Sequence, residues 1–166
     1  MRHLLALVLT LAIVVPAAAQ NRRGPSTPEE RARAVQIAQK LAADPLDDSL
    51  KDDRTWLLKW AADVPDITVS ICASNDEFKK KYKYRPEMTF QKMASSLAFV
   101  IEHPDQSQDK VAEELAGVQG ALNAYQVILK ANPKAHSPYW DELLQKQSAA
   151  TLKEFVADYV TTKCSK

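Results

Sequence analysis

Residues 106–131 read QSQDKVAEELAGVQGALNAYQVILKA. Apolar side chains recur in this stretch every three or four positions, and they are Val111, Leu115, Val118, Leu122, Tyr125 and Leu129. This spacing places one apolar face on an α-helix. Asn132 and Pro133 follow directly, and a residue before proline is typical of a helix end. The stretch therefore predicts one long amphipathic helix, against which the rest of the chain can pack.

The same spacing, interrupted by prolines, recurs on both sides of this helix. Further helices are predicted over about residues 27–43, 47–63 or 49–63, 86–102, 138–147 and 150–163. The chain has three glycines, and two of them lie within a helical pattern, so few positions suit hairpin turns that need a positive φ. We therefore predict an all-α fold, a single compact bundle of about five or six helices.

Residues 67–71 depart from the helical pattern. Ile67, Val69 and Ile71 alternate with Thr68 and Ser70, and alternation over five residues is typical of a strand. No second segment offers itself as a pairing partner. A buried extended segment and a short helix both remain open as interpretations.

The amino-terminal residues have the layout of a secretory signal peptide. A short basic start precedes an apolar run over residues 4–15, and an A-x-A cleavage site follows at residues 17–19. The run is too short to span a bilayer comfortably. We therefore expect an exported protein, periplasmic or secreted, with no transmembrane anchor after cleavage of residues 1–19. A flexible leader is expected over residues 20–26 and a single helical domain over residues 27–166.

The chain contains two cysteines, Cys72 and Cys164. An even pair in an exported chain predicts one disulfide, with two free thiols as the alternative. The bond would tie the end of the chain to its middle. A loop of that length corresponds to about 4–5 kcal/mol in the loop-entropy description of disulfides.

Charge is balanced over the chain but not along it. Without Arg2, which would leave with the signal peptide, 21 basic and 21 acidic residues remain, so a nucleic-acid partner is not expected. One basic patch stands out, formed by Lys79, Lys80, Lys81, Tyr82, Lys83, Tyr84 and Arg85. Cations interleaved with tyrosines can clamp an anion. The alternative is a solvated loop or the start of a helix, neutralised by the nearby acids Asp76 and Glu77.

Two further sets of residues suggest a groove. Trp56 and Trp60 share one helical face, and Gly117 and Gly120 give the 106–131 helix a smooth strip. Together they predict a groove for a ligand. The alternatives are tryptophans in the core and close contact between two helices at the glycines, where each glycine costs about 1 kcal/mol relative to alanine.

No catalytic, metal or cofactor motif can be assigned. Acids cluster near the start of the 47–63 helix without the order of a calcium-binding loop. His103 and His136 lack a partner at metal-binding spacing, and Glu102, Glu113 and Glu114 cannot be given acid and base roles from spacing alone. We therefore name no catalytic residue, no metal ligand and no cofactor.

The general plan, a small exported helical chain with one disulfide, resembles that of acid-stress periplasmic chaperones. The segment AGVQG at residues 116–120 and the terminal Cys164 resemble features of small periplasmic immunity proteins. These resemblances imply a stress chaperone or an immunity-type protein as alternatives. The residues themselves favour a non-enzymatic binding module that meets a protein or an anionic envelope component. A small hydrolase-type enzyme without a recognisable motif is a further alternative.

Overall fold

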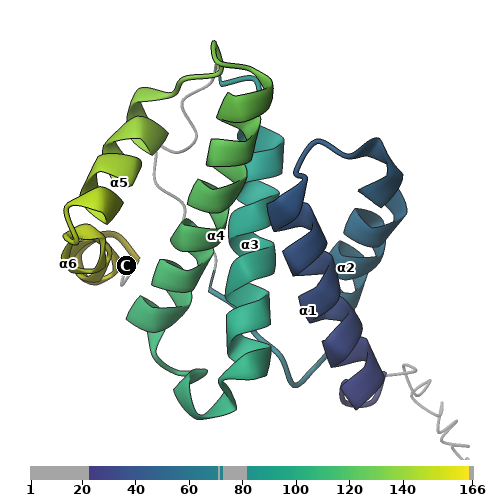
Figure 1. Cartoon of the computed structure of the whole chain (residues 1–166). Coiled ribbons are helices and arrows are strands. Elements are labelled where there is room, and N and C mark those ends of the chain that lie inside the picture. Colours follow the sequence, from purple (N-terminus) through teal and green to yellow (C-terminus); the bar gives the residue numbers. More distant parts are fainter. Residues whose placement is uncertain (1–22, 71, 73–81, 165–166) are drawn as a thin grey trace, which may run out of the picture.

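The computed structural model describes residues 23–70, 72 and 82–164, and within them the chain folds into six α-helices (Figure 1). The helices are α1 (Pro28–Ala43), α2 (Lys51–Asp63), α3 (Arg85–Glu102), α4 (Lys110–Ala131), α5 (Pro138–Ser148) and α6 (Leu152–Tyr159). Short 3₁₀ turns cover Asp48–Leu50 and Pro104–Gln106, and a π-helical turn covers Val160–Cys164. The predicted all-α bundle is confirmed. The predicted signal peptide lies outside the described residues.

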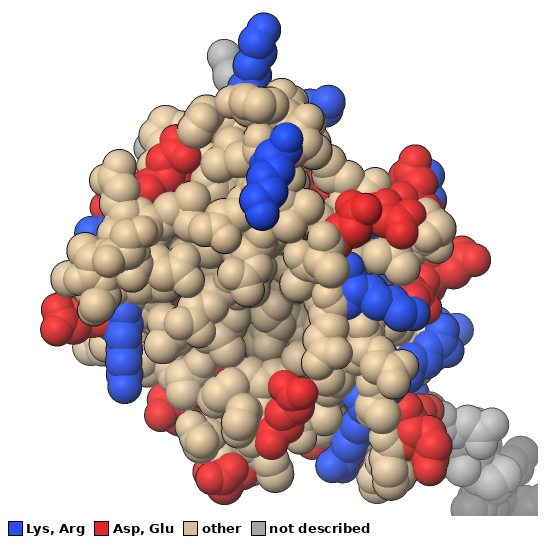
Figure 2. Space-filling model, in the orientation of Figure 1, with Lys and Arg blue, Asp and Glu red and all other residues tan. Residues whose placement is uncertain are grey.

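Helices α3 and α4 lie side by side at the centre of the bundle and make its most extensive contact (Figure 1). On one side, α1 packs against both, and α2 covers the outer face of α1. On the other side, α5 and α6 pack against α4. Figure 2 shows that uncharged side chains dominate the face over α4, while both signs of charge are interspersed around its rim. None of the described helices is long and apolar enough to cross a membrane.

The central helices separate two apolar cores. One lies among α1, α2 and α3, and its largest members are Ile37, Leu41, Leu57, Trp60 and Leu97. The other lies among α4, α5, α6 and the start of α3, and its largest members are Met88, Leu122, Tyr125, Ile128, Trp140 and Leu143. Each core uses one face of α3 or α4, which is why the spacing of apolar residues along both helices is so regular.

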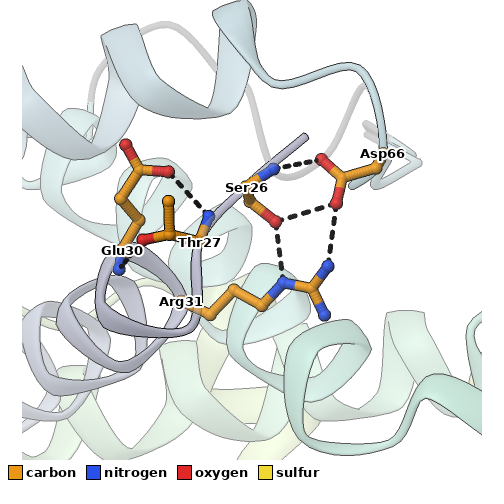
Figure 3. A network of polar contacts seen from close by, with 5 residues as sticks. All are labelled: Ser26, Thr27, Glu30, Arg31 and Asp66. Carbon is orange, nitrogen blue, oxygen red and sulfur yellow. Dashed lines mark hydrogen bonds and ion pairs between the residues drawn. The ribbon is translucent and has the colours of Figure 1, made fainter. Parts of the chain in front are cut away.

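A network of polar contacts fixes the start of α1 to the loop after α2 (Figure 3). Thr27 and Glu30 form a reciprocal capping box, in which each side chain accepts a hydrogen bond from the other residue's backbone amide. Asp66 accepts bonds from the Ser26 amide at 2.8 Å and the Ser26 hydroxyl at 2.9 Å. Arg31 binds both Ser26 and Asp66. Ser26, which we assigned to the leader, is therefore held by the folded domain.

The segment before Cys72 is neither helix nor strand over Ile67–Ser70. Ile67 is buried and Val69 is partly buried, while Thr68 and Ser70 are exposed, so the alternation predicted from the sequence is present. The described residues contain no strand for this segment to pair with. Instead, the Ser70 amide donates to the carboxylate of Glu113 on α4. Ile71 lies outside the described residues.

The carboxyl-terminal part of the chain changes direction after α5 and changes its helix type after α6. Helix α5 ends in a Schellman motif, in which Thr151 N–H donates to Lys146 O and Ala150 takes a left-handed φ of 57°. The predicted 150–163 helix is therefore shorter, since α6 begins at Leu152 and gives way to the π-helical turn after Tyr159. This turn brings Cys164 to Cys72, with 5.6 Å between their Cα atoms. The predicted disulfide is confirmed.

Candidate functional site

A cavity of about 200 Å³ lies beside the disulfide. Three elements form it: the irregular segment before α3, the first turn of α4 and the π-helical turn. Its lining residues are Ser70, Cys72, Lys110, Glu113, Glu114, Val160 and Cys164. We call this cavity the disulfide pocket. It joins positions that lie far apart in the sequence, and the bond between Cys72 and Cys164 forms one of its walls.

Glu113 is the most deeply buried charged group of the disulfide pocket, with 1% of the residue exposed. One of its oxygens accepts the Ser70 amide, and the other lies 3.1 Å from the ammonium of Lys110, a side chain that is 43% exposed. Asp109 caps the helix immediately before, by accepting from the amides of residues 111 and 112. Glu113 thus occupies the first turn of α4, where the helix dipole favours a negative charge.

Glu114, the neighbouring carboxylate, is paired from α3. The ammonium of Lys92 lies 2.7 Å from Glu114 Oε1 and donates to the Cys72 carbonyl at 2.6 Å. The pair crosses the α3–α4 interface because Gly117 lets the two helices approach closely there. A side-chain carbon at Gly117 would collide with Ser96 and would lie 3.0 Å from the Lys92 carbonyl. The glycine, the buried ion pair and the disulfide pocket are therefore parts of one arrangement.

The walls of the disulfide pocket combine two kinds of chemistry. Glu113 and Glu114 bring carboxylate oxygens, while Val160 and the disulfide bring apolar and polarisable surface. The volume exceeds that of a single water molecule and is smaller than the 300 Å³ or more that is typical of pockets for drug-sized ligands. The arrangement suits a small group with one polar end and one apolar end.

The predicted basic patch is only partly described, since Lys79, Lys80 and Lys81 lie outside the described residues. Tyr82 donates to the Ala135 carbonyl at 3.1 Å, and buried Tyr84 accepts from the Asn132 side chain at 3.1 Å. Both rings pack in or against the core among α4, α5, α6 and the start of α3. They therefore anchor the start of α3. Burial raises the pKa of Tyr82, which keeps its phenol a hydrogen-bond donor. Lys83 and Arg85 are exposed. Anion binding by this patch stays a prediction.

The residues of the predicted groove lie in two different places. Trp56 and Trp60 stack on each other along α2, with ring centroids 5.6 Å apart, and the Arg33 guanidinium lies 4.1 Å from the centre of the Trp56 ring. Gly117 and Gly120 face Ser96 and Ser95 within the α3–α4 interface. In Figure 1, α1 and α3 stand between α2 and α4. These contacts correspond to the structural alternatives, core packing for the tryptophans and close helix contact for the glycines.

Three of the acids and histidines considered from the sequence have partners in the structure: Asp47, Asp53 and His136. Asp47 accepts from the Ser49 amide and hydroxyl, and the hydroxyl bond is the main cause that lowers the pKa of this carboxyl. Asp53 pairs with Arg33 at 3.4 Å and with Lys40 at 3.5 Å. His136 lies 3.1 Å from the Asp141 carboxylate, which also accepts the Tyr125 hydroxyl at 2.7 Å. These contacts cap turns and join neighbouring elements.

Sequence reasoning named Glu113 and Glu114 without a role and missed Lys92 altogether. The positions of Glu114 and Lys92 relative to the apolar residues of their own helices already indicated that both are buried. Glu114 precedes Val118 by four positions and therefore falls on the buried face of α4, and Lys92 follows Met88 by four positions on the buried face of α3. A charged residue on an apolar helix face needs a buried partner. Opposite charges at such positions on two neighbouring helices would have indicated the pair.

The chain matches no protein-family model, no curated protein and no solved structure. No relative therefore assigns a role to the residues of the disulfide pocket. Its chemistry has to be read from the buried carboxylates, their lysine partners and the disulfide alone.

Proposed function

We propose that this chain is a small exported binding module of the cell envelope or the extracellular space, and that its ligand enters the disulfide pocket. The observation that carries the proposal is a cavity lined by two carboxylates that are almost fully excluded from solvent. Buried charges are costly, so proteins keep them chiefly where a partner or a ligand balances them. A cavity with a few convergent polar groups is the usual form of a binding site.

Two features support export. A disulfide between Cys72 and Cys164 persists in oxidising compartments and is rare in the reducing cytosol. The amino-terminal residues have the pattern of a secretory signal peptide, with an apolar run of about a dozen residues before an A-x-A site. The two features are independent, because one comes from the folded domain and the other from the pattern of residues 1–19.

The partners of the two carboxylates in the disulfide pocket favour binding over catalysis. Glu113 is held by the Ser70 amide and the Lys110 ammonium, and Glu114 is held by the Lys92 ammonium. A general base needs a lone pair that its substrate can reach. Both carboxylates are almost fully excluded from solvent and already accept bonds from these donors, which suits them to recognition rather than to proton transfer.

The chaperone alternative receives less support. A holdase presents extended apolar surface to its clients, and large exposed patches mark such surfaces. Among the described residues, the most exposed large apolar side chains are Leu46, at 36%, and Leu58, at 54%. We therefore place recognition at the disulfide pocket rather than on an apolar face.

The test is a screen of small fragments by ligand-observed NMR, with three forms of the protein. The wild type is compared with Ser70→Trp, which fills the disulfide pocket and keeps the backbone amide that bonds Glu113. The matched control is Thr68→Trp, an exposed position two residues earlier in the same irregular segment. Circular dichroism verifies that all three forms are folded.

The proposal expects fragments that bind the wild type and Thr68→Trp but lose their signal with Ser70→Trp. Amide signals of residues 70, 113, 114 and 160 should move on binding to the wild type. Fragments that bind all three forms equally, or a complete lack of hits at millimolar concentration, would contradict a ligand site in the disulfide pocket.

A further inference from the structure

We infer that the ligand of the disulfide pocket is a small alkylammonium group, and that Lys110 occupies its place in the ligand-free protein. The inference rests on the proposed function and adds the chemical class of the ligand. Lys110 and Glu113 supply the central observation, since an ammonium on a four-carbon chain already lies 3.1 Å from the buried Glu113 carboxylate. The protein thus contains an example of the chemistry it would recognise.

The two sides of this contact differ in how firmly they are held. Glu113 is 1% exposed and is fixed by the Ser70 amide as well as by its place in the first turn of α4. Lys110 is 43% exposed and reaches the carboxylate from the rim of the cavity. The Lys110 ammonium can exchange its bond to Glu113 for bonds to water, because 43% of its side chain is already exposed. A ligand cation can therefore take the place of Lys110 beside the buried carboxylate, while Glu113 stays in position.

The remaining walls indicate what should be attached to the ammonium. Val160, Cys72 and Cys164 are the apolar and polarisable members of the lining. An alkyl chain would lie against these groups while its ammonium faces Glu113. A carboxylate or phosphate ligand would instead meet two carboxylates, Glu113 and Glu114, against the single lining cation Lys110, which disfavours an anion in this cavity. A cation with a short apolar stem matches both sides.

Such a group can come from a free small amine or from a lysine side chain of a partner protein. The probe for the shared chemistry is n-butylammonium chloride, with butan-1-ol and sodium butyrate as neutral and anionic controls of similar size. The readout is the backbone amide signal of Ser70 in ¹⁵N–¹H NMR, because this amide donates directly to Glu113. A second arm uses N-acetyl-lysine N-methylamide and its Nε-acetylated form.

Two variants test the role of Lys110. Lys110→Met keeps the length of the side chain and removes the competing ammonium. Its matched control is Lys51→Met, because Lys51 is also an exposed lysine in an i,i+3 pair at 3.1 Å, with Asp48, far from the disulfide pocket. Glu113→Gln removes the charge and keeps an oxygen that can accept the Ser70 amide.

We expect butylammonium, but neither butanol nor butyrate, to shift the Ser70 signal in a saturable way. Lys110→Met should bind butylammonium at least about fivefold more tightly, since even a fully exposed pair contributes up to about that factor and the Glu113 carboxylate is buried. Lys51→Met should bind like the wild type, and Glu113→Gln should lose binding. Binding of the lysine amide and not of its acetylated form assigns the site to a partner's lysine. Binding of butylammonium alone assigns it to a free amine.

Equal shifts with butylammonium and butanol, or weaker binding by Lys110→Met than by Lys51→Met, would overturn the inference. If Glu113→Gln fails to fold, the affinities of Lys110→Met and Lys51→Met for butylammonium still test the inference. Fragments that bind the disulfide pocket while butylammonium does not would leave the proposed function standing and remove only the alkylammonium assignment.

Discussion

The ammonium of Lys92 lies 2.7 Å from a carboxylate oxygen of Glu114, and both side chains are at least nine-tenths excluded from solvent. The same ammonium donates to the carbonyl of Cys72, so one buried cation links α3, α4 and the residue that carries the disulfide. Removal of one member of a buried ion pair leaves the other charge without its partner inside the protein, which is far more costly than the loss of an exposed pair.

Lys92→Met should therefore lower the free energy of unfolding by about 3–5 kcal/mol. Lys51→Met, which breaks an exposed pair, should change it by at most about 1 kcal/mol. The double variant Lys92→Met with Glu114→Leu should be more stable than Lys92→Met alone, because no uncompensated carboxylate remains. Urea unfolding of the four proteins measures this, and a Lys92→Met variant within 1 kcal/mol of the wild type would contradict a structural role for the pair.

Gly120→Ala should destabilise the protein by about 1–2 kcal/mol. A side-chain carbon at this position would overlap both Oγ and Cβ of Ser95 on α3, and overpacking outweighs the gain of about 1 kcal/mol in helix propensity. Ser95→Gly removes the overlapping atoms, so the double variant should lose less stability than the two single changes added together. Asn123→Ala, an exposed position on the same helix, is the control. If the loss of stability in the double variant equalled the sum of the two single losses, the overlap with Ser95 would not be the cause of the destabilisation.

Ala150→Gly should stabilise the protein by about 0.5–1 kcal/mol. Ala150 has a φ of 57°, where an L side chain is strained by about 1–2 kcal/mol and glycine is not. Part of this gain is offset by the greater freedom of glycine in the unfolded chain. Its neighbour Ala149 has a φ of −84°, so Ala149→Gly should be neutral or destabilising. Thermal unfolding of the two variants compares their stabilities. If Ala149→Gly raised the stability and Ala150→Gly did not, the strain would not lie at Ala150.

Stability should fall in acid partly through Asp66. The Ser26 backbone amide, followed by other hydrogen bonds from Ser26 and Arg31, lowers the pKa of this carboxyl below its ordinary value of 3.8. A carboxyl with a lowered pKa stabilises the folded state above its unfolded pKa, and the contribution is lost as the pH falls through the folded pKa. Asp66→Asn should therefore lose stability at pH 7 and lose less between pH 5 and pH 2 than the wild type. If the free energy of unfolding of Asp66→Asn fell with pH as steeply as that of the wild type, this contribution of Asp66 would be excluded. Asp63→Asn is the control and should keep the wild-type dependence on pH.

Reduction of the disulfide should loosen its two ends unequally. The Cys72 end stays anchored, because Lys92 holds its carbonyl and Glu113 holds the Ser70 amide. The Cys164 end belongs to a five-residue turn after α6. Hydrogen exchange after treatment with dithiothreitol should therefore accelerate first in Val160–Cys164, while the Ser70 amide remains protected. Equal acceleration at both ends would show that the bond itself, rather than the buried charges, holds the earlier segment.

Most helices could be predicted from the sequence because their limits depend on local chemistry. Thr27 and Pro28 begin α1, and the residue before Pro133 ends α4, as expected from capping and from the loss of an amide at proline. The end of α6 could not be predicted in this way. No proline or glycine marks the change at Val160, where the helix widens into a π-helical turn and Cys164 joins Cys72.

The site was predictable only in part, because it depends on distances between elements. The disulfide followed from the count of cysteines, and Glu113 and Glu114 were visible as carboxylates without partners. Their partners are supplied by Lys92 across a helix interface and by Ser70 from a segment 43 residues away. A cavity among such groups depends on how closely α3 and α4 approach, and no local pattern in the sequence fixes that distance.

The most direct test of the central claim is a crystal structure of the wild-type protein grown with the strongest fragment from the NMR screen. The account predicts that the fragment lies between the Cys72–Cys164 bond and Glu113, with a polar group in contact with the Glu113 carboxylate. A fragment bound elsewhere on the protein, with the disulfide pocket collapsed or filled by the protein's own side chains, would contradict the account.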